Sequence, residues 1–152
     1  MWRSWLDRIS TKDALRKRHI GCRNGLCAIC EEFDESVDHI FTVYRIADGV
    51  WNGIAQWVHL PPIYLFSFRV VLEIANHSGW SKAKKEPLQG LCILTCWRIW
   101  KARNEMVFRD TSRNVIEIVS DVKALGYLWY RSRGKHSGVD WKGWQAFNFD
   151  VM

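Results

Sequence analysis

One long segment, from about Glu86 to Phe108, constrains the fold more than any other part of the chain. Two stripes of residues recur along it at helical spacing: Leu88, Leu91, Thr95 and Ile99 on one flank, and Trp97, Trp100, Asn104 and Val107 on the other. A helix that is apolar on more than one flank needs neighbours on each of them. The segment therefore predicts a central helix with other helices packed around it.

Shorter periodic segments supply those neighbours. The expected helices are two short ones within residues 2–18 broken near a cap at Ser10, then 37–44 after Ser36, 49–60 after Asp48, 67–79, and 115–133 after Asn114. Asn114 with Glu117 resembles a capping box, whereas the VVLEI run within 67–79 also suits a strand. Residues 81–87 are expected to form a solvated connector, and the aromatic tail 139–152 to dock as an extended arm.

A cysteine pair lies between the expected helices in 2–18 and 37–44, and a histidine lies in the first turn of the second one. Cys27 and Cys30 are three positions apart, and His39 follows nine positions after Cys30. Structural zinc sites use four thiolate or imidazole ligands in a tetrahedron, two of them commonly from a CxxC turn. The three residues therefore predict most of a zinc site.

The fourth ligand is the open question of this pattern. Position 44 would be its place, but Tyr44 stands there, and a phenol with a pKa near about 10 is a poor zinc ligand at neutral pH. Cys22, five positions before Cys27, could supply a substitute thiolate, or His19 or water could complete the site. Both a weakened zinc site and a metal-free remnant of one remain open.

These elements predict a mostly α fold, an irregular multi-helix bundle with a short zinc-knuckle-like insertion near the N-terminus. We expect residues 1–110 to form one helical domain that contains the knuckle-like segment 22–44. Residues 111–152 would add a C-terminal helix and an aromatic tail packed on it. We see no convincing strand pair and no internal repeat.

The charge balance of the chain favours attraction to an anionic partner. The chain has 22 Lys and Arg against 16 Asp and Glu, for a net charge of +6, and contains ten tryptophans. Basic clusters can contact phosphate, although solvated helix ends look the same in sequence. The candidate phosphate contacts are Arg16, Lys17, Arg18 and Arg23. Residues 97–104 interleave aromatic rings with further cations. These side chains could bind nucleic acid, or the rings could belong to the core while the cations form a solvated face.

The motifs together resemble a known family. Over nearly its whole length the chain is similar to the reverse transcriptase zinc-binding domain at the C-terminal end of plant non-LTR (LINE-type) retroelement polyproteins. The similar stretches are SWLDRISTKDALRKR, CAIC, VDHIFTV, VWNGIAQW and CWRIWKARNEMVF. The resemblance implies that Cys27, Cys30 and His39 are zinc ligands and that Tyr44 replaces a family cysteine.

The resemblance implies that the chain is a non-catalytic accessory module of a reverse transcriptase. Such a module would bind RNA or single-stranded DNA and could act with a polymerase in trans. The chain itself has no glycine-rich phosphate loop and no cluster of carboxylates for two-metal phosphoryl transfer, so we do not expect an enzyme. The alternative is a structural or protein-interaction remnant that binds neither metal nor nucleic acid.

The expected location is intracellular, nuclear or cytoplasmic. The first residues lack the apolar core of a signal peptide, and no run of 18 apolar residues predicts a membrane span. Five cysteines, two of them in CxxC spacing and two more, Cys92 and Cys96, one helical turn apart, do not suggest a disulfide framework. Cys92 and Cys96 are expected to be small buried apolar residues.

Overall fold

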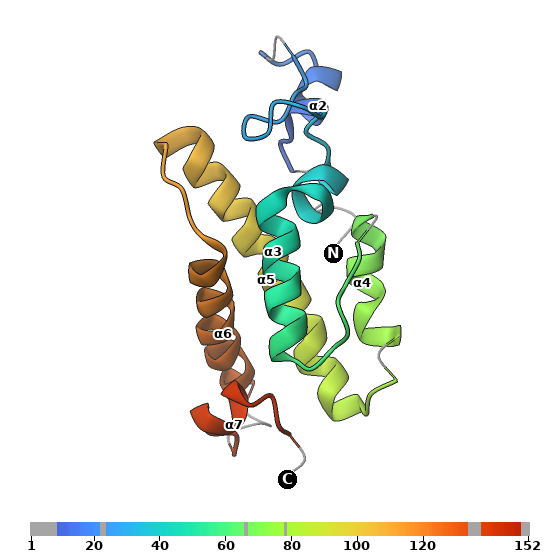
Figure 1. Ribbon diagram of the computed structural model, residues 1–152, viewed down its shortest axis with the longest axis vertical. Helices are drawn as coiled ribbons and strands as arrows, with labels where there is room; N and C mark the ends of the chain where they lie inside the picture. The colour runs from blue at the N-terminus through green and yellow to red at the C-terminus, as the bar shows by residue number, and fades with distance from the viewer. Residues whose placement is uncertain (1–8, 22–23, 66, 78, 134–137, 150–152) are drawn as a thin grey trace.

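The computed structural model describes residues 9–21, 24–65, 67–77, 79–133 and 138–149, and these are mostly helical (Figure 1). The elements are α2 (Lys12–Lys17), the π-helix η1 (His39–Val43), α3 (Arg45–Trp57), α4 (Phe68–His77), α5 (Lys82–Arg109), α6 (Val115–Ser132) and α7 (Trp141–Gln145). Within the described ranges no strand forms, and one isolated antiparallel bridge joins Leu26 to Asp34. The predicted helical class is confirmed.

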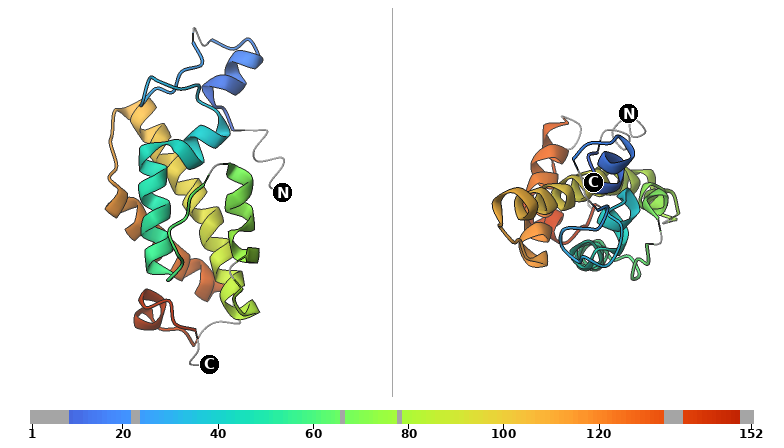
Figure 2. Two further views of the ribbon diagram at one scale, coloured as in Figure 1. Left: turned by 45° about the vertical axis from the view of Figure 1, so that its right-hand side comes forward. Right: turned by 90° about the horizontal axis from the view of Figure 1, so that it is seen from above.

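Helix α5 is the centre of the bundle, as its two apolar flanks predicted. It packs against α6, α4, η1 and α3, which lie around it in the ribbon views (Figures 1 and 2). Leu88, Leu91 and Ile99 on the first stripe are buried. The second stripe is only partly covered, because Trp97 keeps 42% of its surface exposed.

Glycines let the helices around α5 approach closely. A Cβ built at Gly90 of α5 would overlap the Trp129 ring of α6, and one at Gly53 of α3 would lie 2.9 Å from Val119 of α6. A side chain at either glycine would fit only if its neighbour on α6 shifted. Residues 111–132 therefore pack tightly on the helices that precede them, while the predicted boundary near residue 110 stays a prediction.

The C-terminal tail completes the core instead of lying along it as an extended arm, so that expectation is wrong. Asp140 caps the short helix α7 by accepting a hydrogen bond from the Gly143 N–H at 2.7 Å. Trp144 on α7 is fully buried and donates its indole N–H to the Lys123 carbonyl at 2.8 Å. The Trp57 indole N–H of α3 donates to the Gln145 carbonyl at 2.9 Å.

Several predicted boundaries differ from the observed ones. Thr11, not Ser10, caps α2, since its hydroxyl accepts from the Ala14 N–H. Helix α3 begins at Arg45, which places Asp48 in its first turn, where a carboxylate also favours the helix dipole. Residues 82–87, expected to be a connector, form the first turns of α5. The capping box of Asn114 is confirmed.

The helix expected before Ser10 lies largely in residues 1–8, outside the described residues. Residues 67–79, where a strand was an alternative, contain helix α4. None of the described helices combines the length and the apolar character that crossing a bilayer requires.

Candidate metal centre

A compact loop carries the cysteine pair, and we call residues 27–39 the metal loop. The Leu26–Asp34 bridge closes its base. The Cys27 N–H donates to the Phe33 carbonyl at 2.8 Å, and the Glu35 N–H donates to the Gly25 carbonyl at 2.7 Å. These bonds turn the chain back on itself, so both cysteines face the start of η1.

The π-helix sets the position of His39. The Ser36 hydroxyl accepts a hydrogen bond from the His39 N–H at 3.1 Å, which confirms Ser36 as a cap. The Tyr44 N–H then bonds the His39 carbonyl at 2.8 Å, a spacing of five residues that defines a π turn. Single π turns of this kind occur frequently at functional sites.

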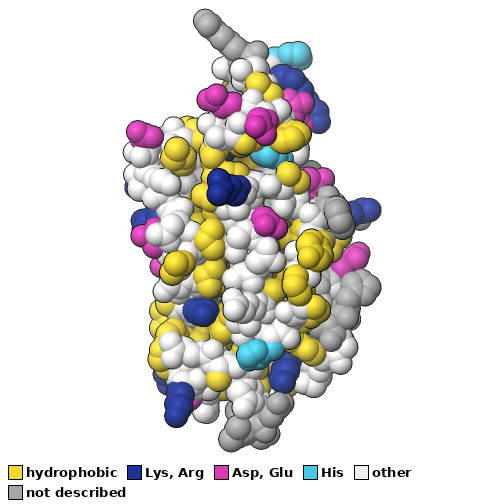
Figure 3. All heavy atoms as spheres, in the orientation of Figure 1, with side chains coloured by type: hydrophobic (Ala, Val, Ile, Leu, Met, Phe, Trp, Pro, Cys, Tyr) yellow, Lys and Arg dark blue, Asp and Glu magenta, His cyan; other side chains and the backbone are white. Residues whose placement is uncertain are grey.

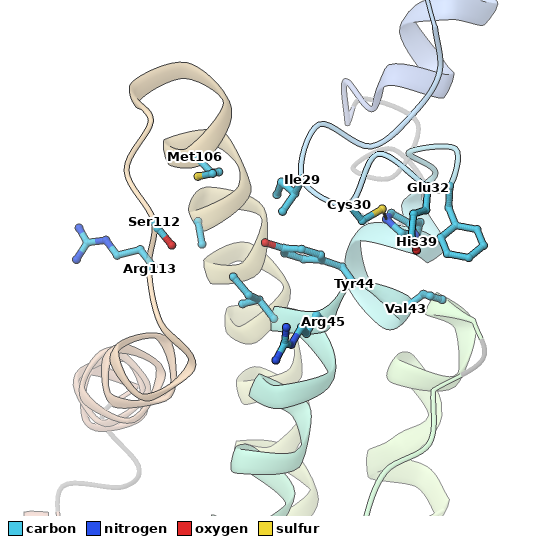
Figure 4. Close-up of a pocket in the computed structure, with 13 residues that line it drawn as sticks. Ile29, Cys30, Glu32, His39, Val43, Tyr44, Arg45, Met106, Ser112 and Arg113 are labelled. Atoms are coloured by element: carbon cyan, nitrogen blue, oxygen red, sulfur yellow. Dashed lines mark hydrogen bonds between the residues drawn. The ribbon is translucent and has the colours of Figure 1, made fainter.

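Three potential ligands meet at this point. The Cys27 and Cys30 sulfurs and one His39 ring nitrogen all lie within 4.8 Å of one another, the one such group in the part of the chain that the structure describes. The Cys30 Sγ and His39 Nε2 atoms are 3.4 Å apart (Figure 4). Zn–S and Zn–N bonds of about 2.3 and 2.0 Å in a tetrahedron would place these two atoms about 3.5 Å apart.

The surroundings shift the pKa values of the two thiols in opposite directions. Burial raises the pKa of the Cys27 thiol, opposed by hydrogen bonds from the Cys30 and Ile29 N–H groups. Burial acts in the same direction at Cys30, but hydrogen bonds from the Glu32 and Phe33 N–H groups outweigh it and lower the Cys30 pKa.

Burial also lowers the pKa of His39, which keeps its imidazole neutral and able to coordinate. The backbone N–H groups around both sulfurs are donors toward thiolate charge. Two thiols, one imidazole and this set of donors fit zinc, and they supply three of the four ligands that a structural site needs.

Tyr44 does not supply the fourth. Its side chain is buried beside the cluster, and its hydroxyl points toward α5 and away from the Cys30 sulfur (Figure 4). Burial, together with the two thiols, raises the Tyr44 pKa to about 12, so the phenol keeps its proton at neutral pH. Cys22, the predicted substitute, lies outside the described residues, as does Arg23.

A cavity of ≈ 600 Å³ opens beside the ligand group and separates it from the end of α5. Cys30, His39 and Tyr44 line one side, and Met106 and Arg113 line the other (Figure 4). The cluster is therefore accessible from this cavity. His19, the other predicted source of a ligand, is exposed at the end of α2.

A buried ion pair fastens the metal loop to the bundle, and sequence analysis missed it. Glu35 is fully buried, and both its oxygens accept from the Arg103 guanidinium of α5, one of them from Nε at 3.2 Å. Glu35 also accepts from the Lys12 N–H at the start of α2, at 3.0 Å. Arg103 was expected on a solvated or nucleic-acid-reading face, and that expectation is wrong.

Arg98 of α5 is buried, whereas Arg16 and Lys17 of α2 are exposed. Arg98 is also buried, in an ion pair with Asp121 of α6, so it is not a phosphate contact. Arg16 and Lys17 are exposed but lie 3.3 and 2.9 Å from the Asp13 carboxylate. The predicted contacts Arg16, Lys17 and Arg18 therefore form an accessible cluster, partly neutralised by Asp13.

Cys92 and Cys96 take no part in the metal centre. Both are buried on α5, and burial raises the pKa of Cys92 to about 12 and that of Cys96 well above its usual value. They behave as small apolar residues, as predicted.

Comparison with known families decides how the ligand group is interpreted. Residues 1–51 match the family described as zinc-binding in reverse transcriptase. The matched segment contains α2, the metal loop and η1. Cys27, Cys30 and His39 therefore lie within the part of the chain that is similar to a zinc-binding family. The similarity seen beyond residue 51, and an origin in a plant LINE-type element, stay predictions. No curated protein and no solved structure matches the chain.

Proposed function

We propose that this chain is a non-catalytic, retroelement-derived accessory module of a reverse transcriptase that binds zinc and single-stranded nucleic acid. The observation that carries the proposal is the clustering of Cys27, Cys30 and His39 within 4.8 Å, inside the segment that matches the zinc-binding family. Zinc held there would fix the metal loop against η1. The fourth ligand would be Cys22 or water.

The proposed partner is RNA or single-stranded DNA, with a reverse transcriptase supplied in trans. The net charge of +6 supports attraction to a polyanion, and such binding weakens steeply as salt rises. No polymerase or nuclease residues are evident in the sequence, so the module would hold nucleic acid near a polymerase without acting on it chemically.

Two measurements on the full chain test this proposal. Elemental analysis of protein purified without chelator should find about one zinc per chain, as a single four-ligand site requires. The zinc should be lost in Cys27→Ser and, if Cys22 is the fourth ligand, in Cys22→Ser. Fluorescence polarisation with labelled single-stranded RNA should show salt-dependent binding, and a wild-type chain that binds neither zinc nor RNA would overturn the proposal.

A second candidate is a structural or protein-interaction remnant of a retroelement. The observation that favours it is Tyr44, a protonated phenol in place of a family ligand, with its hydroxyl turned away from the cluster. A metal-free wild type that nevertheless folds cooperatively and shows no RNA binding would select this candidate.

A further inference from the structure

The metal loop and the opposite end of the bundle differ in charge. The metal loop carries five carboxylates and no Lys or Arg: Glu31, Glu32, Asp34, Glu35 and Asp38. All of them except Glu35 have exposed side chains. Bound zinc would add two positive charges, but two thiolate ligands would cancel them. The carboxylates of the metal loop itself therefore disfavour phosphate, and Arg16, 3.9 Å from Asp34, is a cation beside the loop that belongs to α2.

The opposite end of the bundle is basic. Three segments meet there, and we call their cations the basic end: Lys82, Lys84 and Lys85 at the start of α5, Arg131 and Arg133 at the end of α6, and Lys142 on α7. The carboxylates in residues 82–86, 131–133 and 138–149 are Glu86 and Asp140. Lys and Arg are the main charged side chains in the lower part of the face in Figure 3, whereas Asp and Glu gather toward its upper part.

Contacts between the segments hold these cations on one surface. Arg133 lies 3.6 Å from Glu86, which joins the end of α6 to the start of α5. Tyr127 of α6 packs edge-on against Trp141 of α7 with ring centroids 5.1 Å apart. Figures 1 and 2 show the start of α5, the end of α6 and α7 at the end of the molecule away from η1.

Lys82 and Lys85, in the first turn of α5, lie where folding alone disfavours a cation. The first turn of α5 contains no acidic residue, and the Ser81 side chain makes no capping hydrogen bond. Cations in the first turn oppose the helix dipole. Among the described residues, Lys82, Lys85 and Lys142 pair with no carboxylate. A polyanion would supply the negative charge that the fold omits.

Aromatic rings accompany the cations. The Arg131 guanidinium lies over the Tyr127 ring at 5.5 Å and that of Arg133 over Trp129 at 5.0 Å. Trp141 keeps 40% of its surface exposed. Stacking on exposed rings, combined with cations along a backbone, is how single-stranded nucleic acid is bound without sequence preference.

We infer that the basic end, and not the metal loop, is the principal contact surface for single-stranded nucleic acid. This inference rests on the proposed function and specifies where its partner binds. The metal loop then has a structural task, and the cations of α2 are secondary contacts.

Three triple variants of the full chain test the inference by polarisation with a labelled single-stranded RNA. The first is Lys82→Glu, Lys85→Glu and Lys142→Glu. The second, at the other end, is Arg16→Glu, Lys17→Glu and Arg18→Glu. The third is a control elsewhere on the surface: Arg69→Glu, Lys101→Glu and Arg109→Glu. All three change the net charge equally, and Glu in the first turn of α5 agrees with the helix dipole, so the first variant should fold.

The basic-end variant is expected to bind about tenfold more weakly or worse, and its salt slope should fall by about two, since each lost phosphate contact to a single strand removes about 0.7. The other two variants should lose less than a third of that slope change. Trp141→Ala should weaken binding several-fold at unchanged slope.

Other outcomes would overturn the inference. Equal losses in all three variants would mean that only net charge matters, and a loss confined to the α2 variant would place the contact at the metal end. Binding of the basic end to anionic phospholipid vesicles but not to RNA would assign it to a membrane surface. A wild type that binds no RNA would overturn the proposed function itself, which separates the two failures.

Discussion

Arg103 of α5 donates two hydrogen bonds to the carboxylate of Glu35 in the metal loop, and both side chains are buried. The two residues are 68 positions apart in the chain. A buried charge that loses its partner pays a desolvation penalty without compensation. The pair therefore makes the attachment of the metal loop depend on the central helix.

Removing one member of this pair should be strongly destabilising. Arg103→Leu and Glu35→Gln are each expected to lower the free energy of unfolding by about 3–5 kcal/mol, measured by urea denaturation. The matched control is Arg133→Ala, which breaks the exposed pair with Glu86 and should cost less than about 1 kcal/mol. Equal effects of the two pairs would contradict the assignment of Glu35 as an anchor.

Tyr44 can be tested as a non-ligand. Tyr44→Phe removes only the hydroxyl, which points away from the cluster, so zinc affinity in a chelator competition should stay the same. Tyr44→Cys introduces a thiol beside the ligand group and is expected to tighten zinc binding at least about tenfold. Loss of zinc in Tyr44→Phe would show that the phenol coordinates after all.

Zinc binding should strengthen as pH rises. Burial raises the pKa of the Cys27 thiol and lowers that of His39, so at neutral pH the imidazole is already neutral while Cys27 still carries its proton. Binding below the Cys27 pKa must release that proton. The apparent affinity is therefore expected to rise by up to about tenfold per pH unit between about pH 6.5 and 8.5 for each proton released. A flat profile over this range would mean that Cys27 is not a ligand.

The C-terminal tail should carry a large share of the stability. Trp144 is fully buried against Trp57, Tyr130 and Phe149, with ring centroids 5.4–6.0 Å apart. Trp144→Ala is expected to lower the free energy of unfolding by about 3–5 kcal/mol. Trp97→Ala removes a ring that is 42% exposed and should cost clearly less in the same urea experiment. A small effect at Trp144 would mean that the tail does not dock in solution.

Because α5 packs closely on α6, adding one methyl group at Gly90 should destabilise the protein. Gly90→Ala would force its Cβ against the Trp129 ring and should destabilise the protein by about 1–3 kcal/mol, although alanine favours helix formation. Gln89→Ala, at the exposed neighbouring position, should change the free energy of unfolding by less than about 0.5 kcal/mol. A stabilised Gly90→Ala would show that the two helices are further apart than described.

Local patterns predicted the parts of the fold that depend on neighbours in sequence. The two stripes of α5 predicted a central helix, and Asn114 with Glu117 predicted the start of α6, because helical periodicity and capping act within a few residues. Cys27, Cys30 and His39 were recognisable for the same reason, since a knuckle and the following turn bring them together locally.

Long-range contacts account for what was missed. Arg98 and Arg103 look like surface cations in sequence, and only their partners Asp121 and Glu35, distant along the chain, explain their burial. The early start of α5 was not predicted, because the SKAKKEP stretch has no apolar stripe that would indicate a helix. The tail alternates aromatic residues as an exposed strand would, but Trp144 reaches the core through a short helix.

The hydrogen bond from Trp57 to Gln145 links positions 88 residues apart and has a consequence for synthesis on the ribosome. The metal loop and η1 emerge early and can acquire their local contacts at once. Glu35 stays unpaired until Arg103 has been synthesised, and Trp57 stays uncovered until α7 has been synthesised. A nascent chain is thus expected to pass through a stage in which its metal loop is formed while its aromatic core is still open to chaperones.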